Sequence, residues 1–413
     1  MMRTLIARRI FDKALVIKRI SPVRAAAVMA LCCLAPAAAA QQGPVETISE
    51  VPRKGRLALF KAQEKKDEGK PGEAARIFSE FLEKSPDEDH FLLRYHYGNT
   101  LMSLERGEEA LAQFRMAVGM EQRFWQGWLN LGETAYNLEK YSEAARAIMK
   151  GYELNPDRQP RLLYFAAAAH IMAGDPGSAK PLLEELVFDR SIEQRLDWFR
   201  AMIMACADLG DRETGDRAAD RMLELFGDDP AAWDLAFQHA ASFQDYRSAA
   251  VALTVKSYLT PLDRAEKMQL GNLYAAIEIP YAASIWYEAA IDTSAESRDW
   301  EKLASVYMAA HEPEMALETL RTALDNDPTA KLWSLLGDLY YLEEDYDNAY
   351  DAFGRSLEID PDSGRALLMM GYCALETGRA GKAAEHLRAA AAYPDYSANA
   401  NALLKRALEA RGS

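Results

Sequence analysis

The sequence predicts an all-α protein, a superhelical solenoid of about ten helix-turn-helix repeats with a capping helix at its C-terminus. Residues 331–361 place large apolar and small side chains at helical spacing twice, and Pro361 then ends the second of two short amphipathic helices. The same pattern recurs from starts at about residues 55, 91, 125, 160, 196, 230, 264, 297, 330 and 364. Because one helical pair cannot bury its own apolar face, successive pairs must stack into a solenoid.

The first 40 residues have the order of a secretory signal peptide. Seven Lys and Arg residues precede the short apolar block AAAVMALCCLAPAAAA, and Ala38, Ala39 and Ala40 offer a small-residue cleavage site before Gln41. Two alternatives are an uncleaved anchor, which the short block broken by Pro36 disfavours, and lipidation at Cys32 or Cys33. The sequence therefore predicts export, which in a Gram-negative cell means the periplasm.

Removal of this leader makes the chain more acidic. The formal net charge is −15 for the whole sequence and about −21 without residues 1–40. Such a surface repels nucleic acid and anionic lipid, so we expect neither as a partner. No later apolar run is long enough to span a membrane.

A linker is expected over residues 41–54 and the repeat array over residues 55–395. Small residues recur at the eighth and twentieth positions of the repeats, where they let paired helices approach closely. At the eighth position these are Gly98, Gly132, Gly271, Ala304, Gly337 and Gly371. At the twentieth they are Ala110, Ala144, Ala249, Ala283, Ala316, Ala349 and Ala383.

Two repeats fit the pattern poorly. The fifth has Gly215 where Ala is expected, and the first has Lys61 and Lys65 where apolar residues should point inward. The first repeat is therefore expected to be a frayed end or a cap with a wet outer face. After the array, residues 396–413 are expected to form the capping helix and tail.

The pattern resembles the tetratricopeptide repeat (TPR). The third copy carries Trp128, Leu131, Gly132, Ala144 and Pro156 at the positions that define such repeats. Several matches at fixed offsets in several copies make this resemblance specific. It implies a concave groove, lined by the first helix of each repeat, that binds a protein segment.

The sequence shows no catalytic or metal-binding constellation, so we expect neither an enzyme nor a cofactor. The six histidines are scattered, and no H-E-x-x-H pair or Gly-x-Ser-x-Gly turn is present. Without the leader only Cys206 and Cys373 remain, five repeats apart, and we expect both to be buried thiols.

The resemblance places the second, fifth, ninth, twelfth and thirteenth positions of each repeat at the groove. An aromatic and Met-rich lining suits an extended or helical apolar segment. The alternative is that some of these side chains pack against the neighbouring helix. The predicted groove residues are Tyr95, Asn99, Tyr136, Asn137, Tyr164, Met268, Asn272, Met308, Tyr341, Leu368 and Tyr372.

A row of cations also occupies the second position of three successive repeats, at Arg298, Lys331 and Arg365. In so acidic a protein this row can engage a carboxylate or an acidic peptide, or it can be ordinary surface charge. It lacks the Lys and paired Asn of the carboxylate clamp found in chaperone-binding TPR domains.

A closer resemblance lies in the C-terminal half. The segment LTPLDRAEKMQLGNLYAAIEIPYAASIWYEAAI from Leu259, followed by DWEKLASVYMAAHEPEMALETLRTA, is similar to the TPR protein often encoded beside TonB, ExbB and ExbD. Leu259-Thr260, the run from Pro280 to Ala283, and the tail from about Ser397 to Ala410 carry this resemblance. It implies a periplasmic scaffold that assists TonB-dependent uptake of iron or similar nutrients. TonB, an ExbD-like domain or a TonB-dependent receptor would be the partner.

Two other classes stay open at this point. One is a generic periplasmic TPR scaffold for another envelope or polysaccharide-export assembly. The other is an enzyme subunit or substrate-binding protein whose site the sequence does not reveal.

Overall fold

The computed structural model describes residues 50–292 and 295–412, and the predicted signal peptide lies outside these residues. The described chain forms α-helices and one short 3-10 helix, so the predicted all-α repeat fold is confirmed. It divides into two compact units, residues 50–243 and 244–412, and each is described by itself. We call the odd-numbered helices α3 to α21 first helices and the even-numbered helices α4 to α22 second helices.

The N-terminal unit contains five helix pairs and one further first helix. Its elements are α3 (Arg53–Asp67), α4 (Pro71–Lys84), the 3-10 helix η4 (Pro86–Glu88), α5 (Phe91–Met102), α6 (Gly107–Met120), α7 (Trp125–Asn137), α8 (Tyr141–Leu154), α9 (Pro160–Met172), α10 (Pro176–Phe188), α11 (Leu196–Leu209), α12 (Arg212–Phe226) and α13 (Pro230–Ser242).

The C-terminal unit begins with a second helix, continues with four helix pairs and ends with a single helix. Its elements are α14 (Tyr246–Leu259), α15 (Arg264–Ala276), α16 (Pro280–Ala290), α17 (Ser297–Ala309), α18 (Pro313–Asn326), α19 (Ala330–Leu342), α20 (Tyr346–Ile359), α21 (Gly364–Glu376), α22 (Ala380–Ala390) and α23 (Pro394–Gly412).

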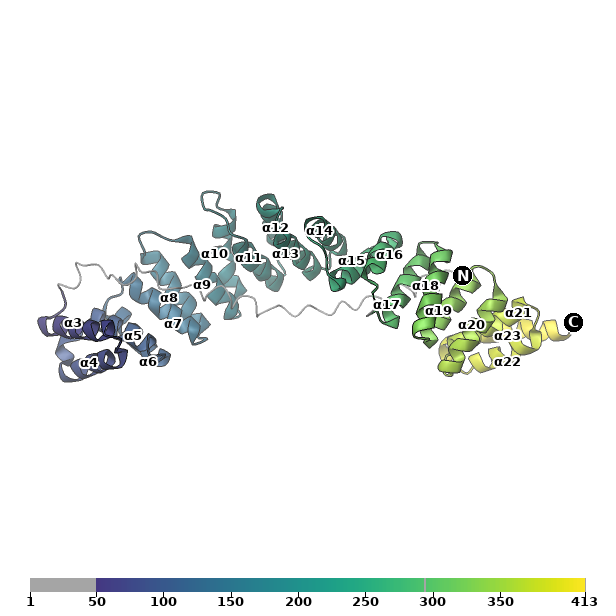
Figure 1. The fold of residues 1–413 in the computed structure, drawn as a ribbon, viewed down its shortest axis with the longest axis horizontal. Coiled ribbons are helices and arrows are strands. Elements are labelled where there is room, and N and C mark those ends of the chain that lie inside the picture. Colours follow the sequence, from purple (N-terminus) through teal and green to yellow (C-terminus); the bar gives the residue numbers. More distant parts are fainter. Residues whose placement is uncertain (1–49, 293–294, 413) are drawn as a thin grey trace. The chain divides into compact units, whose positions relative to one another are not determined.

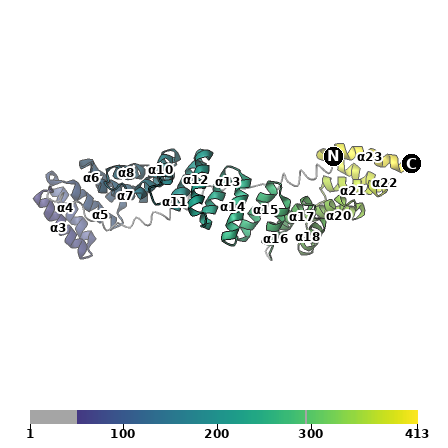
Figure 2. The ribbon, with the colours of Figure 1, turned by 90° about the horizontal axis from the view of Figure 1, so that it is seen from above.

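The first helices begin where the sequence spacing places them. Nine of the ten start at the predicted residue, and α3 starts at Arg53, two residues before the predicted position 55. Within each unit the pairs follow one another in chain order (Figures 1 and 2). The closing helix α23 packs on both α21 and α22, so it covers the end of the last pair.

Turn chemistry explains where each second helix begins. In every repeat the residue two before the second helix adopts a positive φ, which reverses the chain within a short turn. Glycine, which takes this conformation without strain, fills the place at Gly69, Gly174, Gly210 and Gly378. The second helices α8, α14, α18 and α20 each end two residues before a proline, as predicted for Pro156, Pro261, Pro328 and Pro361.

The core lies between the paired helices and follows the repeat. A β-carbon on Gly98 would come within 2.6 Å of Phe114, and one on Gly337 within 2.8 Å of Phe353. An added β-carbon would likewise come too close to the side chain sixteen positions later at Gly132, Gly271 and Gly371. The eighth-position glycines are therefore required because a large side chain of the second helix rests on their backbone.

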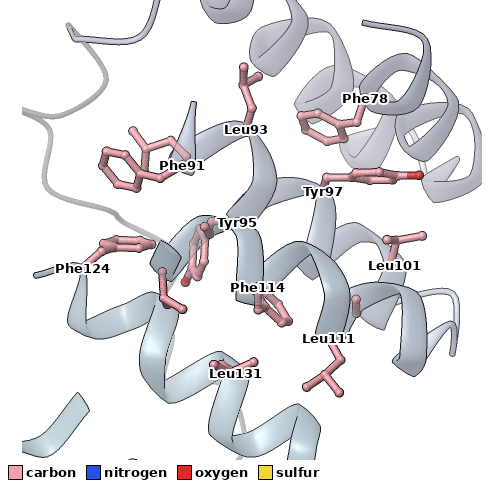
Figure 3. Close-up of a cluster of buried hydrophobic side chains, with 14 of the residues drawn as sticks. Phe78, Phe91, Leu93, Tyr95, Tyr97, Leu101, Leu111, Phe114, Phe124 and Leu131 are labelled. Carbon is pink, nitrogen blue, oxygen red and sulfur yellow. The ribbon is translucent and has the colours of Figure 1, made fainter. Parts of the chain in front are cut away.

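A cluster of buried aromatic side chains joins helices α4 to α7 (Figure 3). Tyr95 on α5 packs edge-on against Phe124, with ring centroids 4.9 Å apart, and lies 6.0 Å from Phe114 of α6. Phe78 of α4 stacks on Tyr97 of α5 at 5.7 Å. Such rings contribute both buried area and favourable ring geometry to the contact between successive repeats.

The first repeat forms a complete helix pair despite its two lysines. Lys61 is exposed on α3, and Lys65 lies 2.9 Å from the carboxylate of Glu68. Ala58 and Ala62 supply the buried side of the same helix. The outer side of α3 is therefore wet, which is the cap-like alternative that the sequence left open.

Candidate protein-binding face

The candidate site is the outward side of the first helices, which we call the first-helix face. Successive first helices contact one another, α3 with α5 and α9 with α11 in the N-terminal unit, and α17 with α19 in the C-terminal unit. Side chains that point away from the paired second helix therefore lie beside those of the neighbouring repeat where these helices meet.

In the N-terminal unit, polar side chains from neighbouring repeats are hydrogen-bonded to one another on this face and form one polar group. The side-chain amide of Asn130 on α7 donates a hydrogen bond to Oδ1 of Asn99 on α5, at 2.7 Å. Burial raises the pKa of Tyr95, and hydrogen bonds with Asn99 and Asn130 oppose that rise. The Tyr95 ring is thus part of the core, whereas its hydroxyl group joins the two amides.

Glu133 on α7 lies beside this polar group and is half-buried. Burial raises the pKa of its carboxyl group, and its charge in turn raises the pKa of Tyr95. No described residue forms an ion pair or hydrogen bond with the Glu133 side chain. A half-buried carboxylate of this kind would be satisfied by a cationic or N–H group of a bound segment.

The structure separates the predicted groove residues by burial. Asn137 is exposed, and four others are half-buried, namely Asn99, Tyr164, Asn272 and Tyr372. The remaining six have exposed fractions of 9% or less, namely Tyr95, Tyr136, Met268, Met308, Tyr341 and Leu368. Those six side chains pack between helices, which is the alternative stated in the sequence analysis. They therefore have little exposed surface for contact with a partner.

Local contacts explain this burial. Tyr341 of α19 lies edge-on against Tyr372 of α21, with ring centroids 5.4 Å apart, and both pack on Tyr346 of α20 at 6.1 Å. Burial, followed by the neighbouring Tyr341, raises the pKa of Tyr372. Asn272 accepts a hydrogen bond from the hydroxyl of Tyr287 at 2.8 Å, which ties α15 to α16.

The predicted basic row is also divided. Arg365 of α21 is engaged, because its guanidinium pairs with the buried carboxylate of Asp338 and donates to Ser334 Oγ at 2.8 Å. Burial raises the pKa of Asp338, and the charge of Arg365 opposes that rise. Arg298 and Lys331 are exposed, and neither forms an ion pair with another part of the described chain.

Two further groups that the sequence analysis did not select complete this area. Burial raises the pKa of Glu301, and the charges of Lys331 and Arg298 oppose the rise. Lys302 lies 5.8 Å from the ring of Tyr287, and burial followed by the charge of Arg298 lowers its pKa. Glu301 and Glu133 occupy the fifth and ninth repeat positions already assigned to the groove, so position pointed to them although residue type did not.

We call Arg298, Lys302 and Lys331 the basic cluster. The charges of Arg298 and Lys331 both lower the pKa of the half-buried Glu301, and Arg298 and Asp299 act in opposite directions on the pKa of Lys302. Arg298 and Lys331 each stand at the second residue of a first helix, where a cation opposes the helix macrodipole. Stabilisation of the helices therefore does not account for these two cations.

Both cysteines of the described chain are buried and free, as the sequence predicted. Burial raises the pKa of Cys206 to about 11 and that of Cys373 to about 12. At neutral pH both are thiols that react slowly. Among residues 50–292 and 295–412, no three His, Cys, Asp or Glu side chains are grouped so that they could hold a metal ion. In the same ranges no helix is both long and apolar enough to cross a bilayer.

Comparison with solved structures returns other helical-repeat proteins at low similarity. A chain of the Naa15/Naa10 complex bound to HypK-THB is 16% identical with a TM-score of 0.45, over 91% of this chain and 64% of that chain. A tetratricopeptide repeat protein from Parabacteroides merdae is 12% identical with a TM-score of 0.36, over 62% of this chain and 99% of that one. Yeast Tom70 is 10% identical with a TM-score of 0.34, over 87% and 96%.

No curated protein matches the chain. Models of the tetratricopeptide repeat match residues 61–127, 97–161 and 301–364 in one form and residues 340–407 in another, which together cover about half of the chain. These segments coincide with helix pairs that carry the small residues and turns described above. The chain belongs to the tetratricopeptide repeat family.

Proposed function

We propose that this protein is a scaffold that holds a segment of a partner protein on its first-helix face, with the basic cluster receiving an acidic side chain or a terminal carboxylate. The observation that carries this proposal is that Arg298 and Lys331 are exposed and unpaired within the described chain, on consecutive first helices. A carboxylate there gains charge-assisted hydrogen bonds without displacing an existing ion pair.

The N-terminal unit offers a second, different contact. The amides of Asn99 and Asn130 can hydrogen-bond to the backbone of an extended segment, and Glu133 can accept from a Lys or Arg side chain. Within the N-terminal unit this area therefore suits a segment that carries a cationic side chain, whereas the basic cluster of the C-terminal unit suits an acidic one.

We further propose that the protein acts in the periplasm as an accessory of a TonB-dependent uptake system for iron or similar nutrients. TonB, ExbD or a TonB-dependent receptor is the proposed partner. This part of the proposal is supported by the leader-like sequence of residues 1–40 and by the resemblance carried by Leu259-Thr260 and the run from Pro280 to Ala283. A scaffold for another envelope or polysaccharide-export assembly is the alternative.

Photocrosslinking in the native host tests the partner. The crosslinker replaces Lys331 and, separately, Asn137, because both are exposed on the first-helix face. Asp351, exposed on the second helix α20, provides the control position. Capture of TonB, ExbD or a receptor from the first two positions and not from Asp351 supports the proposal. Capture of another envelope assembly from the same positions retains the scaffold and replaces the TonB partner.

Charge reversal tests the basic cluster. Combined Arg298→Glu and Lys331→Glu substitution should weaken binding of the captured partner by about tenfold or more, most strongly at low salt. The matched control is Arg355→Glu on α20, which reverses an exposed charge away from this face. Equal binding by both variants would exclude the basic cluster from the site.

A further inference from the structure

The outward side of two second helices differs from that of the others. The sixth residue of the second helices is charged and exposed in six of ten repeats, at Arg76, Arg146, Arg217, Glu318, Asp351 and Glu385. In α14 and α16 the same place is taken by Val251 and Ile285, whose exposed fractions are 54% and 50%. Two consecutive repeats thus replace a solvated charge with a branched aliphatic side chain.

Tyrosines extend this change along the same helices. Tyr281 is the second residue of α16 and is 63% exposed, and Tyr258 is the thirteenth residue of α14 and is 83% exposed. Five other second helices carry an acidic residue at the thirteenth place, at Glu83, Glu153, Glu224, Asp325 and Glu358. We call Val251, Tyr258, Tyr281 and Ile285 the α14–α16 apolar patch.

The fold itself does not need these exposed side chains. The buried sides of the two helices are supplied by other residues, including Ala249 and Leu253 on α14 and Ala283 and Tyr287 on α16. Both helices pack on α15 through those buried sides. Exposed aliphatic side chains accompanied by tyrosines on two consecutive second helices are typical of a protein contact surface.

The charges beside the patch are self-complementary. Arg247, the second residue of α14, is exposed and forms no ion pair among the described residues. Glu288, the ninth residue of α16, is also exposed, and one of its oxygens accepts from the Tyr307 hydroxyl at 3.1 Å. If the same face of a second copy approaches with its helices antiparallel, the start of α14 meets the end of the other α16. Arg247 then faces Glu288 of the other copy.

We propose that the α14–α16 apolar patch binds a second copy of this chain in a twofold contact, with Val251 facing Ile285 of the other copy. Twofold contacts bring identical surfaces together, so a face that carries like charges is unsuitable. The equivalent places on α18, α20 and α22 hold Glu318, Asp351 and Glu385, which would repel their own copies in an acidic protein. This contact lies on second helices and leaves the first-helix face free for a partner segment.

Light scattering after gel filtration of the purified chain tests the proposal. The wild-type chain should have twice the mass of one chain, and Val251→Lys or Ile285→Glu should raise the dimer dissociation constant by about tenfold or more. The double variant Val251→Lys with Ile285→Glu should regain much of the affinity, because each new cation faces a new carboxylate of the other copy. Asp351→Lys, a charge change at the equivalent place on α20, should leave the dimer intact.

Circular dichroism separates loss of association from loss of fold, since each variant should keep the helicity of the wild type. A wild-type chain that is monomeric at every concentration would overturn the proposal and leave the patch to a different protein. A dimer that persists in both single variants would also overturn it. If the double variant did not regain dimer affinity, Val251 would not face Ile285 of the other copy.

Discussion

Gly215 of α12 lies directly beneath the imidazole of His239 from α13, so that a β-carbon at residue 215 would come within 2.3 Å of the ring. The His239 ring is buried, and its Nε2 lies 2.7 Å from a carboxylate oxygen of Asp216. The ring therefore cannot move aside without losing this contact. The misfit of the fifth repeat is thus a local exchange, in which the small residue makes room for a buried histidine.

Gly215→Ala should destabilise the N-terminal unit although it restores the usual residue of the repeat. Alanine in a helix normally gains about 0.5 to 1 kcal/mol over glycine, but overpacking against a held ring costs about 1 to 3 kcal/mol. We expect a net loss, measured by urea unfolding. Gly119→Ala is the control, because residue 119 is exposed on α6 and nothing lies within 4 Å of its added β-carbon. If both substitutions raised the free energy of unfolding equally, the His239 ring would be able to move away from the added β-carbon at little cost.

The sequence was sufficient for the repeat frame because the frame is set by local chemistry. Glycines at the eighth position, prolines after the second helices and the apolar spacing all act within one repeat, and the helices begin at the predicted places. Gly215 could not be explained in this way, since its partner His239 belongs to the next repeat. Contacts between repeats are not encoded in the spacing of one repeat.

The residues of the predicted basic row should differ in their contribution to the free energy of unfolding, because only Arg365 pairs with a buried carboxylate. Arg365→Ala should lower the free energy of unfolding by about 2 kcal/mol or more, since it leaves the buried carboxylate of Asp338 without its cation. Lys331→Ala should change it by about 0.5 kcal/mol or less, because the side chain is exposed.

A cycle checks the origin of this difference. Asp338→Asn removes the buried charge, so Arg365→Ala should cost less in that background than in the wild type. Equal costs in the two backgrounds would show that Arg365 stabilises the protein through packing over Phe353, whose ring centroid lies 5.9 Å from the guanidinium carbon, and not through Asp338.

The burial of the predicted groove residues could not be read from their repeat positions, for a physical reason. Tyr341 and Tyr372 occupy groove positions in neighbouring repeats, but large rings at such positions reach each other and close over the surface. Burial of Tyr341 to a 7% exposed fraction is thus a consequence of residue size in two repeats at once. Asn137, a smaller polar residue at the thirteenth position of its repeat, stays at the surface.

Loss of the Tyr341 ring should therefore destabilise the C-terminal unit. Tyr341→Ala leaves a cavity beside Tyr346 and Tyr372 and should cost about 3 kcal/mol or more, as for other buried aromatic residues. Asn137→Ala, at an exposed groove position of the N-terminal unit, should cost about 0.5 kcal/mol or less. Urea unfolding followed by circular dichroism compares the two. If Tyr341→Ala lowered the free energy of unfolding only slightly, Tyr341 would again be a candidate for direct contact with a partner.

Stability should fall in mild acid because of one histidine on α5. Burial lowers the pKa of His96 to about 4 from its ordinary value of 6.5, and the charge of Lys66 adds to this. In the unfolded chain the imidazole takes up a proton near pH 6.5, whereas in the folded chain it stays neutral until about pH 4. Stability contributed above pH 6.5 is therefore lost as the pH falls from about 6.5 towards 4. Between about pH 7 and pH 5 the loss should be about 2 kcal/mol.

His96→Gln should remove this part of the pH dependence. Urea unfolding of the two proteins at about pH 8 reports the packing cost of the substitution alone, because the imidazole is then neutral in both states. Relative to that difference, the variant should gain on the wild type as the pH falls to about 5. A constant difference across the whole range would mean that His96 is protonated as readily in the folded protein as in the unfolded chain. The ring would then be reached by water between α5 and its neighbours.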